Sequence, residues 1–502
     1  MIMSSAPPEV LIIGAGPSGL LLALELCRHG VRPRLIDALP GPSPLSRAVA
    51  MHARTLELLD RHGLAEQFLR RGEVVRGAGL RRSGRVVATF PLGRIGEGLS
   101  PFPFVLTISQ DQTERLLREA LATQGVQVEW NTTLVALTQD AASATATLHV
   151  GSGPPEAVRV AYVLGCDGAR SAVRQALGIA FPGGTYEQLF YVADTLTEGL
   201  APDAEFGRRL EVSLAARRFQ AFFPMPQGRT RIIGLLPDGL NHETATFAQV
   251  QPALEAAEHV RVREVSWFST YRVHHRVAEH FRQGRAFLVG DAGHIHSPAG
   301  GQGMNTGLGD AANLGWKVAA VLRYAAPDAL LDTYEAERLP FARKLVATTD
   351  RGFTAATRPS AWASFVRTWL APLLLPVALR VAWVRRLMFR TISQISIAYP
   401  HSPLSQGRTG RVAGGQRLPW AAGPRFAALR QPGWHVLHVG PVPTAAAWAL
   451  AQHLPATEVA PAAGETPGTV YLVRPDAYIG LAAATFNEAE FQAYASEWVM
   501  GQ

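Results

Sequence analysis

The beginning of the chain alternates short apolar runs with glycines. Val10–Ile13 is an aliphatic run that ends at a glycine, which predicts a buried strand. Ser18–Gly30 carries leucines at helical spacing and stops at a glycine, which predicts a helix. Arg34–Asp37 predicts a second strand. A strand–helix–strand opening of this kind predicts a parallel α/β sheet.

The apolar pattern of the next three hundred or so positions is mixed. Helices are expected over residues 113–123 and 309–322, and short strands over 126–130, 162–164 and 286–289. Residues 208–236 instead alternate apolar and polar positions and turn at Gln227-Gly228. This alternation is typical of an antiparallel sheet with one covered face.

A predicted helical run extends to about Ala398. After Pro403 the composition shifts to proline and glycine, which indicates a linker. The tail that follows is expected to be compact, with strands at 435–439 and 470–473.

Composition narrows the class of protein. The 502 residues are 47% hydrophobic, which is enough for a large core and excludes a mainly disordered or fibrous chain. Two cysteines, Cys27 and Cys166, cannot build a disulfide framework or a four-cysteine zinc site. Because the first residues also lack a secretory leader, we expect a cytoplasmic protein.

The net charge is +8, from 48 basic and 40 acidic residues. Attraction of an anionic ligand or membrane surface is one interpretation, and ordinary solvated surface charge of an arginine-rich protein is the other. No basic helix or known motif indicates nucleic-acid binding, so no nucleic-acid partner is expected.

The segment Trp369–Phe389 requires a check for membrane contact. It is long and apolar, but Arg380 lies at its centre and prolines at 372 and 376 interrupt it. We interpret it as a buried or amphipathic helical region, and we do not expect a membrane partner. An interfacial membrane contact is the alternative.

The first chemical motif is Gly14-Ala15-Gly16-Pro17-Ser18-Gly19, between the first strand and the first helix. In such a loop the first glycine permits a tight turn, the second lets a pyrophosphate approach, and the third lets helix and strand pack closely. Asp37 ends the second predicted strand, where a carboxylate can accept hydrogen bonds from ribose hydroxyls. This placement predicts dinucleotide binding, the alternative being a glycine-rich turn without a ligand.

Two further turns follow predicted strands. Gly290-Asp291-Ala292-Gly293-His294 leads into Pro298-Ala299-Gly300-Gly301-Gln302-Gly303-Met304-Asn305, whose glycines would leave bare amides at a helix start. Gly165-Cys166-Asp167-Gly168 follows the strand at 162–164. Helix capping by the two aspartates is the alternative interpretation. The spacing His294-Ile295-His296 resembles a metal pair, but no acidic or cysteine cluster supports it, so no metal site is expected.

The three motifs, in this order, resemble those of the FAD-dependent aromatic hydroxylases, the class A flavoprotein monooxygenases typified by para-hydroxybenzoate hydroxylase. The resemblance runs from about Val10 to Tyr399. It is greatest to the longer bacterial members that act on phenols, hydroxyphenylpropionate or polyketide rings. Their tail is thioredoxin-like, and Leu472-Val473-Arg474-Pro475-Asp476 resembles its signature.

The resemblance implies roles for matching residues. The first motif would meet the FAD pyrophosphate, with Arg47 reaching it from the following loop. Asp37 would hold the adenosine ribose, where relatives more often have glutamate. Gln110 and Asp291 would lie along the ribityl chain, and the loop before residue 305 would present its backbone to the isoalloxazine. The implied cofactor-binding residues are Gly14, Gly16, Pro17, Ser18, Gly19, Asp37, Arg47, Gln110, Asp167, Gly168, Asp291, Pro298, Gly301, Gly303, Met304 and Asn305.

The resemblance also implies a reaction. NAD(P)H would reduce FAD, O2 would add at flavin C4a, and the hydroperoxide would hydroxylate a phenolic or polycyclic aromatic substrate. No second strong glycine fingerprint occurs, so NAD(P)H is expected to bind transiently. The sequence assigns no catalytic residue. Candidates for a base are Tyr191, Arg218, Tyr271, His274 and His275, although for each of them a structural role is favoured over a catalytic one.

The expected fold class is α/β: a Rossmann-like FAD-binding domain, an inserted mixed or antiparallel sheet domain for the substrate, and a thioredoxin-like C-terminal domain. The predicted boundaries are 1–75, 101–184 and 271–400 for the first, 76–100 and 185–270 for the second, and 401–502 for the third. A homodimer is also considered.

Other functions compatible with the motifs are a flavin-dependent epoxidase, a Baeyer–Villiger oxygenase, an antibiotic-modifying monooxygenase, and a non-catalytic, membrane-associated flavin protein. The tail contains no cysteine, so it cannot perform thioredoxin-like redox chemistry.

Overall fold

The first aliphatic run forms β1 (Val10–Ile13), which lies inside a six-stranded sheet of order β18-β19-β12-β1-β2-β8. The structure is a computed structural model that describes residues 9–43, 46, 48–200, 202–215, 218–241, 243–297, 299–357, 370, 374, 377–379, 381–462 and 464–499. Neighbouring strands are parallel except at the β18 edge. The other strands are β2 (Arg34–Ile36), β8 (Val128–Glu129), β12 (Tyr162–Gly165), β18 (Arg282–Gln283) and β19 (Ala286–Leu288).

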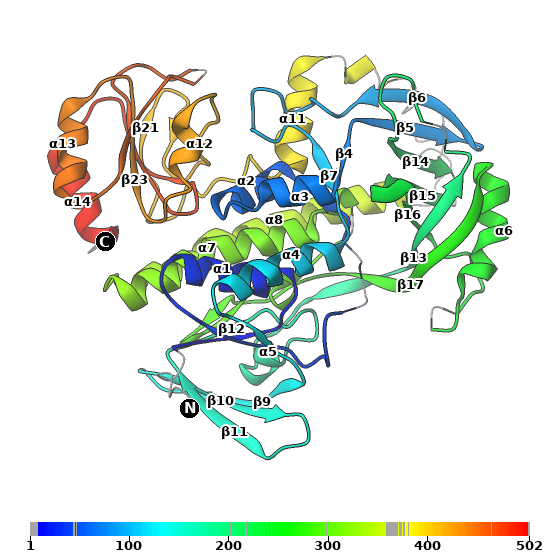
Figure 1. Cartoon of the computed structure of the whole chain (residues 1–502), viewed down its shortest axis with the longest axis horizontal. Helices are drawn as coiled ribbons and strands as arrows, with labels where there is room; N and C mark the ends of the chain where they lie inside the picture. The colour runs from blue at the N-terminus through cyan, green and yellow to red at the C-terminus, as the bar shows by residue number, and fades with distance from the viewer. Residues whose placement is uncertain are drawn as a thin grey trace.

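Every residue of β1 and β12 is buried, because both faces of this sheet are covered. Figure 1 shows α1 and α7 on one side of β12, and α5 with a small antiparallel sheet on the other. That small sheet comprises β9 (Thr132–Gln139), β10 (Ala144–Val150) and β11 (Pro155–Val160). The helices of this region are α1 (Pro17–Arg28), α2 (Ala53–Arg61), α3 (Ala65–Arg71), α4 (Gln110–Thr123), α5 (Ala172–Ala176), α7 (Gly303–Arg323) and α8 (Ala329–Thr357).

The predicted helices are present, but two begin earlier than expected. The helix predicted over 113–123 begins at Gln110, after Ser109. The helix predicted over 309–322 begins at Gly303. Glycine has a low helix propensity, so the glycines at its start hid the first turns of α7 from sequence analysis.

The predicted antiparallel region belongs to an eight-stranded sheet of order β20-β17-β13-β16-β15-β14-β5-β6, in which only the β14–β5 pair is parallel. The turn predicted at residues 227–228 lies in a short 3-10 segment, Pro226–Gly228. The strands are β5 (Gly77–Arg82), β6 (Arg85–Pro91), β13 (Gly183–Glu198), β14 (Leu210–Ala215), β15 (Arg218–Pro224), β16 (Thr230–Leu235), β17 (Arg261–Val277) and β20 (His294–Ile295).

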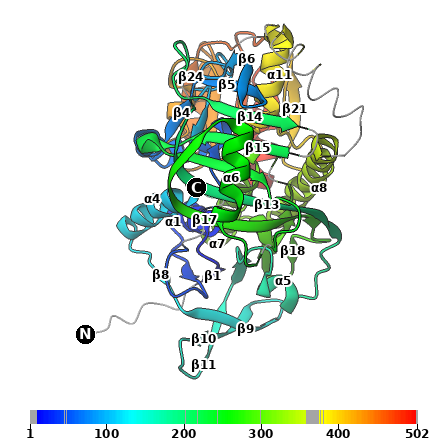
Figure 2. The same cartoon turned by 90° about the vertical axis from the view of Figure 1, so that its right-hand side faces the viewer.

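The two faces of this sheet have different surroundings. α6 (Phe247–Glu258) covers one face, as Figure 2 shows, and packs there on Tyr191, Phe222 and Ile232. The opposite face carries a second apolar cluster, because successive side chains of a strand point to opposite sides. We call it the aromatic face. It comprises Phe190, Val192, Ile233 and Val273, with Phe219, Phe223, Trp267 and Tyr271 packed against them.

A short sheet connects the two large ones. It consists of β3 (Ala50–Met51), β7 (Val105–Thr107) and β4 (Glu73–Val75) in the order β3-β7-β4. The helical run predicted to reach about residue 398 contains α8 and α11 (Ala382–Ile392), and part of it, including most of 358–380, lies outside the described residues.

The C-terminal part forms its own six-stranded sheet of order β22-β21-β26-β25-β23-β24. β23 and β24 are parallel and joined by α13, whereas β25 and β26 form an antiparallel pair followed by α14. The elements are β21 (Gln406–Thr409), β22 (Val412–Ala413), α12 (Pro424–Ala428), β23 (His435–Val439), α13 (Pro443–Ala451), β24 (Ala456–Val459), β25 (Val470–Val473), β26 (Ile479–Ala483) and α14 (Glu488–Trp498).

This C-terminal part shares a core with the first region. Trp316 of α7 meets Trp434 edge to face, with ring centroids 5.7 Å apart, in one buried cluster. Beside it, the fully buried Glu337 carboxylate of α8 accepts hydrogen bonds from Arg474 at 2.6 and 2.9 Å and from Lys317 Nζ at 2.9 Å. Burial alone would raise the pKa of Glu337, but Arg474 and Lys317 together hold it well below its usual range. The signature residue Arg474 thus joins the tail to α8.

Candidate functional site

The loop between β1 and α1 is tightly packed at two of its three motif glycines and open at the third. A Cβ at Gly14, whose φ is +102°, would come within 2.4 Å of the Cys166 carbonyl oxygen. A Cβ at Gly19 would come within 2.0 Å of the Gly14 carbonyl oxygen. At Gly16, by contrast, no heavy atom of the described residues other than its own chain neighbours lies within 4 Å of that position. Gly16 therefore borders free space at the start of α1, whose N-cap has no side-chain hydrogen bond.

Asp37 lies directly beside this loop. Its Oδ2 accepts a hydrogen bond from the Ala15 amide at 2.7 Å, and its Oδ1 accepts one from the Leu39 amide at 2.9 Å. Each carboxylate oxygen can accept a further bond. The predicted ribose contact is compatible with this position, and Asp37 also fixes the loop.

The three motifs, distant in sequence, meet in the structure. Ser18 of the first motif fits between Gly290 and Gly307, where a Cβ would come within 2.7 and 2.3 Å of its Oγ. The first motif also rests on Cys166, whose amide donates to the Ile13 carbonyl at 2.7 Å. Arg174, just after the third motif, donates to the Ala292 carbonyl at 2.8 Å. The structure therefore brings all three turns to one place.

Asp167 combines the two interpretations given to it. Its Oδ2 accepts from the Val173 amide at 3.1 Å, so it helps to cap α5 together with Ser171. Its Oδ1 is buried without a hydrogen-bond partner among the described residues, and burial raises the pKa of this carboxyl. An unpaired buried acceptor points to a polar ligand.

The Asn305 side chain fixes the start of α7 through buried hydrogen bonds. The buried Asn305 side chain donates to the Ala50 and Gly301 carbonyls at 2.9 and 2.8 Å. It accepts from the His52 amide at 2.9 Å and from Thr55 Oγ1 at 2.7 Å. Gln302, the N-cap, makes no side-chain cap, so the first amides of α7 are offered outward. The exposed Asp291 lies in the preceding turn, whereas Pro298 is outside the described residues.

Gln110 connects this site with the eight-stranded sheet. Its amide donates to Ser46 Oγ at 3.0 Å, and its Oε1 accepts from the Ala48 amide at 3.3 Å. The fully buried Arg231 of β16 donates to the Ala48 carbonyl at 2.7 Å and to Ser46 Oγ at 3.1 Å. Arg231 is paired with Asp194 at 2.6 and 2.7 Å. The aromatic face, to which Arg231 belongs by alternation, is thereby turned toward the loop that contains Arg47, itself outside the described residues.

Comparison with known proteins decides the family. The model of an FAD binding domain matches residues 8–349. The chain is 37% identical to 6-methylpretetramide 4-monooxygenase from Streptomyces rimosus over 81% of its length and 72% of that protein. It is 36% identical to rifampicin monooxygenase from Streptomyces venezuelae over 78% of its length and 79% of that protein. It also matches the solved structure of an anhydrotetracycline hydroxylase from Streptomyces rimosus, with a TM-score of 0.76, 30% identity, and coverage of 98% and 99% of the two chains.

The chain belongs to the FAD-dependent aromatic hydroxylases. The resemblance drawn from the three motifs is thus confirmed at the level of the family and its cofactor, FAD.

The geometry of this hydroxylase fits FAD. The open side of Gly16 can admit a pyrophosphate, the amides at the start of α1 and α7 favour negative charge, and Asp167 Oδ1 needs a donor. The other predicted cofactor residues that the structure describes are Gly14, Pro17, Ser18, Gly19, Asp37, Gln110, Gly168, Asp291, Gly301, Gly303, Met304 and Asn305. Their individual contacts to the cofactor stay predictions.

Sequence analysis missed a buried ion network behind the site of this hydroxylase. Asp310 of α7 accepts from the Gly290 amide at 3.1 Å, pairs with His294 Nε2 at 2.7 Å, and pairs with Arg338 Nε at 2.5 Å. Arg338 and His294 outweigh burial and hold the pKa of Asp310 below its usual value. An aspartate inside an otherwise apolar helix was the available signal. No group of three or more His, Cys, Asp or Glu residues in the described ranges could hold a metal ion.

The candidate bases divide between the two faces of the sheet. Tyr191 lies under α6, where its hydroxyl donates to Gln220 Oε1 at 2.7 Å and burial raises its pKa. Tyr271 stacks on Phe190 in the aromatic face. His274 is hydrogen-bonded to Thr185, and His275 packs against the Tyr186 ring. Arg218 lies in β15, and its side chain is outside the described residues.

His296 lies close to the start of α7. In the sequence it stands out only through its spacing from His294, which resembles a metal pair. Its Nε2 is buried without a partner among the described residues and lies 3.9 Å from where a Cβ at Gly303 would be. Burial lowers its pKa to about 4, so the ring is neutral near pH 7. Its Nδ1 donates to the Ser297 carbonyl at 2.8 Å, so the free Nε2 of the neutral ring can only accept a hydrogen bond.

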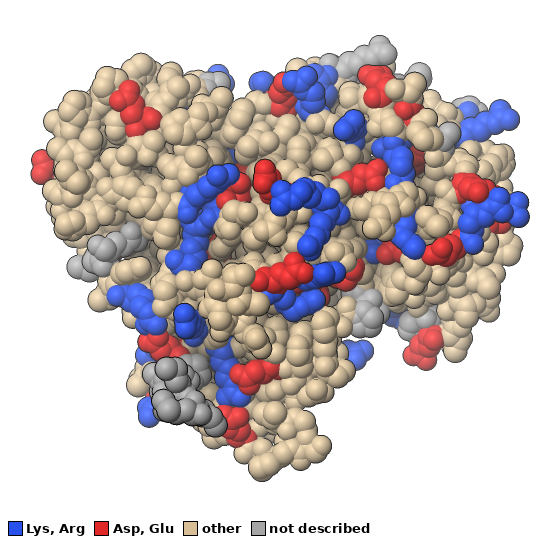
Figure 3. Space-filling model, viewed as in Figure 1, with Lys and Arg blue, Asp and Glu red and all other residues tan. Residues whose placement is uncertain are grey.

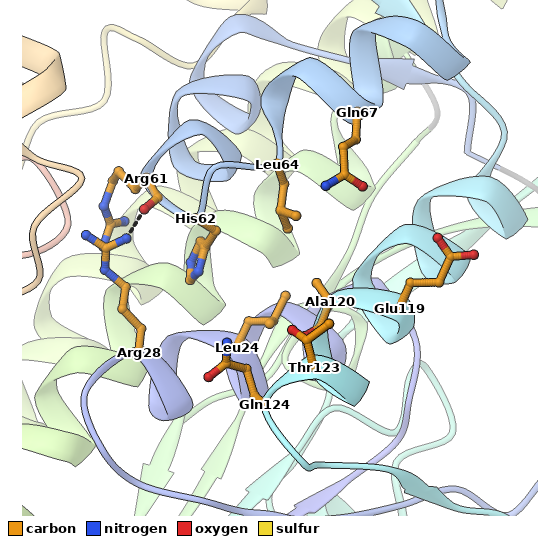
Figure 4. Close-up of a pocket in the computed structure, with 10 residues that line it drawn as sticks. All are labelled: Leu24, Arg28, Arg61, His62, Leu64, Gln67, Glu119, Ala120, Thr123 and Gln124. Carbon is orange, nitrogen blue, oxygen red and sulfur yellow. Dashed lines mark hydrogen bonds between the residues drawn. The ribbon is translucent and has the colours of Figure 1, made fainter.

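A separate cavity of about 420 Å³ opens between α1, α2, α3 and α4 (Figure 4). Its charged groups are paired within the protein: Arg61 and His62 contact Glu25, and Arg28 donates to the carbonyls of Arg61, Leu429 and Arg430. It contains none of the predicted cofactor residues. We assign it no ligand.

The Asn305 side chain gives a first prediction. Replacing it by leucine removes two donors and two acceptors from buried partners, so we expect a loss of about 2–3 kcal/mol in the free energy of unfolding. Urea unfolding of the purified protein measures it. The control Gln175→Leu, on an exposed side chain of α5, should change stability by less than about 0.5 kcal/mol. An Asn305→Leu variant as stable as the parent would contradict the supporting role.

Proposed function

We propose that this chain hydroxylates a phenolic or polycyclic aromatic compound, using NAD(P)H, O2 and bound FAD. The observation that carries the proposal is the meeting of the three turns around the first motif, which leaves Gly16 open. The aromatic face of the sheet is joined to the neighbouring Ser46–Ala48 loop by Arg231. Bound FAD would take electrons from NAD(P)H and transfer one oxygen atom of O2 to the ring, the other leaving as water.

The residues of the chain itself would bind and orient the aromatic substrate and shield it from water. Phe223, Trp267 and Tyr271 are half-buried and offer an apolar wall on which a planar ring can stack, and the fully buried Phe190 supports them from within the sheet. Arg231, 5.5 Å from the centroid of the Trp267 ring, fixes this wall to the Ser46–Ala48 loop. The relatives named for 6-methylpretetramide and anhydrotetracycline favour a polycyclic substrate over a single phenol ring.

Oxidation of NADPH and NADH by the purified yellow protein tests the proposal. A panel from simple phenols to anhydrotetracycline-like polycycles should include a compound that stimulates oxidation, with a product heavier by one oxygen atom. Incubation without a substrate is the control. Stimulated oxidation without any oxygenated product from the whole panel would reject hydroxylation.

Paired substitutions of adjacent phenylalanines test the aromatic face. Phe223→Leu should raise the KM for the aromatic substrate about 10-fold, because loss of stacking and apolar contact costs about 1.4 kcal/mol. Phe222→Leu, on the opposite side under α6, should lower stability and leave the KM within about 2-fold. Equal KM effects of the two variants would count against the face as the substrate wall.

We further propose that the C-terminal part is a thioredoxin-like domain with a structural role. Its parallel β23–α13–β24 unit and antiparallel β25–β26 pair followed by α14 support this. The boundaries 1–75, 101–184 and 271–400, then 76–100 and 185–270, then 401–502, also stay proposals; β17 crosses the one at 271 and ends at Val277. The homodimer likewise stays a proposal, which light scattering can test.

A further inference from the structure

The positive charge of the chain is concentrated in one stretch of fifty residues. Residues 351–400 contain seven arginines and no aspartate, glutamate or lysine. The other 452 residues therefore carry 41 basic and 40 acidic side chains, which nearly cancel. Over most of the face shown in Figure 3, basic side chains indeed lie near acidic ones. The net charge of +8 is thus a local property.

The same stretch exposes large apolar side chains. Trp383 is 67% exposed and Leu387 is 57% exposed. Of the ten exposed large hydrophobic residues in the described part of the chain, five lie within residues 374–387: Leu374, Val377, Val381, Trp383 and Leu387. Such a concentration on a chain with ample buried core marks an interaction surface.

α11 presents these residues on one side. Trp383, Arg386, Leu387 and Arg390 follow the spacing i, i+3, i+4, i+7, which places them on a single helical face, and all four are exposed. We call this surface, with the exposed Leu374, Val377 and Val381 before it, the α11 face. Figure 1 shows α11 at an outer edge of the molecule, above β7.

The opposite side of α11 is anchored. Phe389 is buried against the loop after β6, where a Cβ at Gly96 would come within 2.2 Å of its ring. Arg385 donates to the carbonyl of the buried Leu379 at 2.9 Å. The outward face is therefore held in place by contacts that do not involve its exposed tryptophan and leucines.

We propose that the α11 face docks the enzyme on a membrane surface that contains anionic phospholipids. A helix with tryptophan and leucine on one face, flanked by arginines, suits the boundary between headgroups and acyl chains. Anionic headgroups match a segment with seven arginines and no acidic residue. No helix among the described residues is both long and apolar enough to cross a bilayer, so the contact is peripheral.

Charge favours a lipid surface over a second copy of the chain. In a two-fold contact through the α11 face, Arg386 and Arg390 would meet the same arginines of the partner. Residues 351–400 contain no acidic residue, and Glu97 in the adjoining loop is already paired with Arg94. Anionic lipids supply the missing negative charge. This inference does not depend on which substrate is hydroxylated.

Co-sedimentation of the FAD-loaded, full-length protein with vesicles tests the proposal. We expect it to bind vesicles of equimolar phosphatidylcholine and phosphatidylglycerol at least about 10-fold more tightly than vesicles of phosphatidylcholine alone. Raising the salt concentration should weaken the binding. Equal binding to both vesicles, or to neither, would overturn the proposal.

Matched variants locate the contact. Trp383→Ser with Leu387→Ser, and separately Arg386→Glu with Arg390→Glu, should each reduce binding to anionic vesicles about 10-fold or more. The controls are Leu450→Ser, on a leucine of α13 that is 77% exposed, and Arg408→Glu with Arg411→Glu in the C-terminal part. FAD absorbance should be unchanged in all of them. Equal losses in test and control variants would overturn the assignment to α11.

Quenching of tryptophan fluorescence tests the proposal on the wild-type protein, and so does not depend on whether the double variants fold. Brominated phosphatidylcholine, mixed with phosphatidylglycerol, should quench part of the tryptophan fluorescence of the wild-type protein, and Trp383→Phe should remove that quenched part. Self-association that disappears in the α11 variants, without vesicle binding, would instead identify the face as a contact between copies and reject the lipid proposal.

Discussion

Replacing Gly16 by valine is expected to give a folded but colourless protein. Gly16 has φ −72° and ψ −178°, an extended backbone that valine adopts readily. Apart from its chain neighbours, no atom of the described residues lies within 4 Å of its Cβ position. The new side chain would therefore occupy the space where the pyrophosphate of FAD is expected. We predict that the Kd for FAD rises at least about 100-fold, equivalent to about 2.7 kcal/mol.

The measurement is a titration of apoprotein with FAD, followed by flavin fluorescence, together with thermal unfolding of the apoprotein. Gly16→Val should lower the stability of the apoprotein by about 1 kcal/mol, which is the usual cost of an apolar residue at a helix N-cap. The loss should be no larger, because the new side chain meets no described residue. Gly19→Val is the contrasting variant, since its Cβ would meet the Gly14 carbonyl at 2.0 Å and should destabilise the fold by about 3 kcal/mol. Unchanged FAD affinity in Gly16→Val would show that the cofactor does not use this opening.

Replacing Glu337 by glutamine is expected to have the largest effect on stability. The carboxylate is completely buried between Lys317 and Arg474, so its loss leaves two buried cations short of negative charge. Breaking a buried ion pair in this way costs about 3–5 kcal/mol. Urea unfolding at neutral pH measures the loss. Glu66→Gln, which removes an exposed i,i+4 pair with Arg70, should cost less than about 0.5 kcal/mol.

The pH dependence of this loss has a defined sign. Because the folded-state pKa of Glu337 is depressed, its stabilisation is complete above its unfolded-state pKa of about 4.3 and is lost as the pH falls below it. The difference in stability between wild type and Glu337→Gln should therefore shrink between about pH 6 and pH 3.5. A difference that grows on acidification would contradict the assigned charge state.

Sequence analysis predicted those parts of the molecule whose signals are local. The β1–α1–β2 unit follows from apolar runs and glycines within thirty or so residues. Each of the three turns is recognisable from its own glycine and aspartate residues. Contacts between distant residues had no such signal: nothing in the neighbourhood of Ser18 indicates Gly307, and nothing near Asp310 indicates Arg338. The start of α7 was missed because glycine is a poor helix former.

The sheet illustrates the same limit. Alternation predicted an antiparallel region over 208–236, but it could not assign Phe222 to the side covered by α6 and Phe223 to the aromatic face. That assignment depends on Arg231 reaching Ser46 and Ala48, far away in sequence. The apolar segment 369–389 was interpreted as buried or amphipathic, and its described part is amphipathic, with Phe389 inside and Trp383 outside.

The hydrogen bonds between Arg231 and the Ser46–Ala48 loop also restrict the motions that the enzyme can make. Moving the eight-stranded sheet away as a lid would break both hydrogen bonds of the buried Arg231 guanidinium to this loop, one to a carbonyl and one to a hydroxyl. Ligand entry and product escape should consequently proceed by local rearrangement around a stationary wall. Kinetic studies of turnover should then find no large hinge motion between the sheet and the nucleotide-binding core.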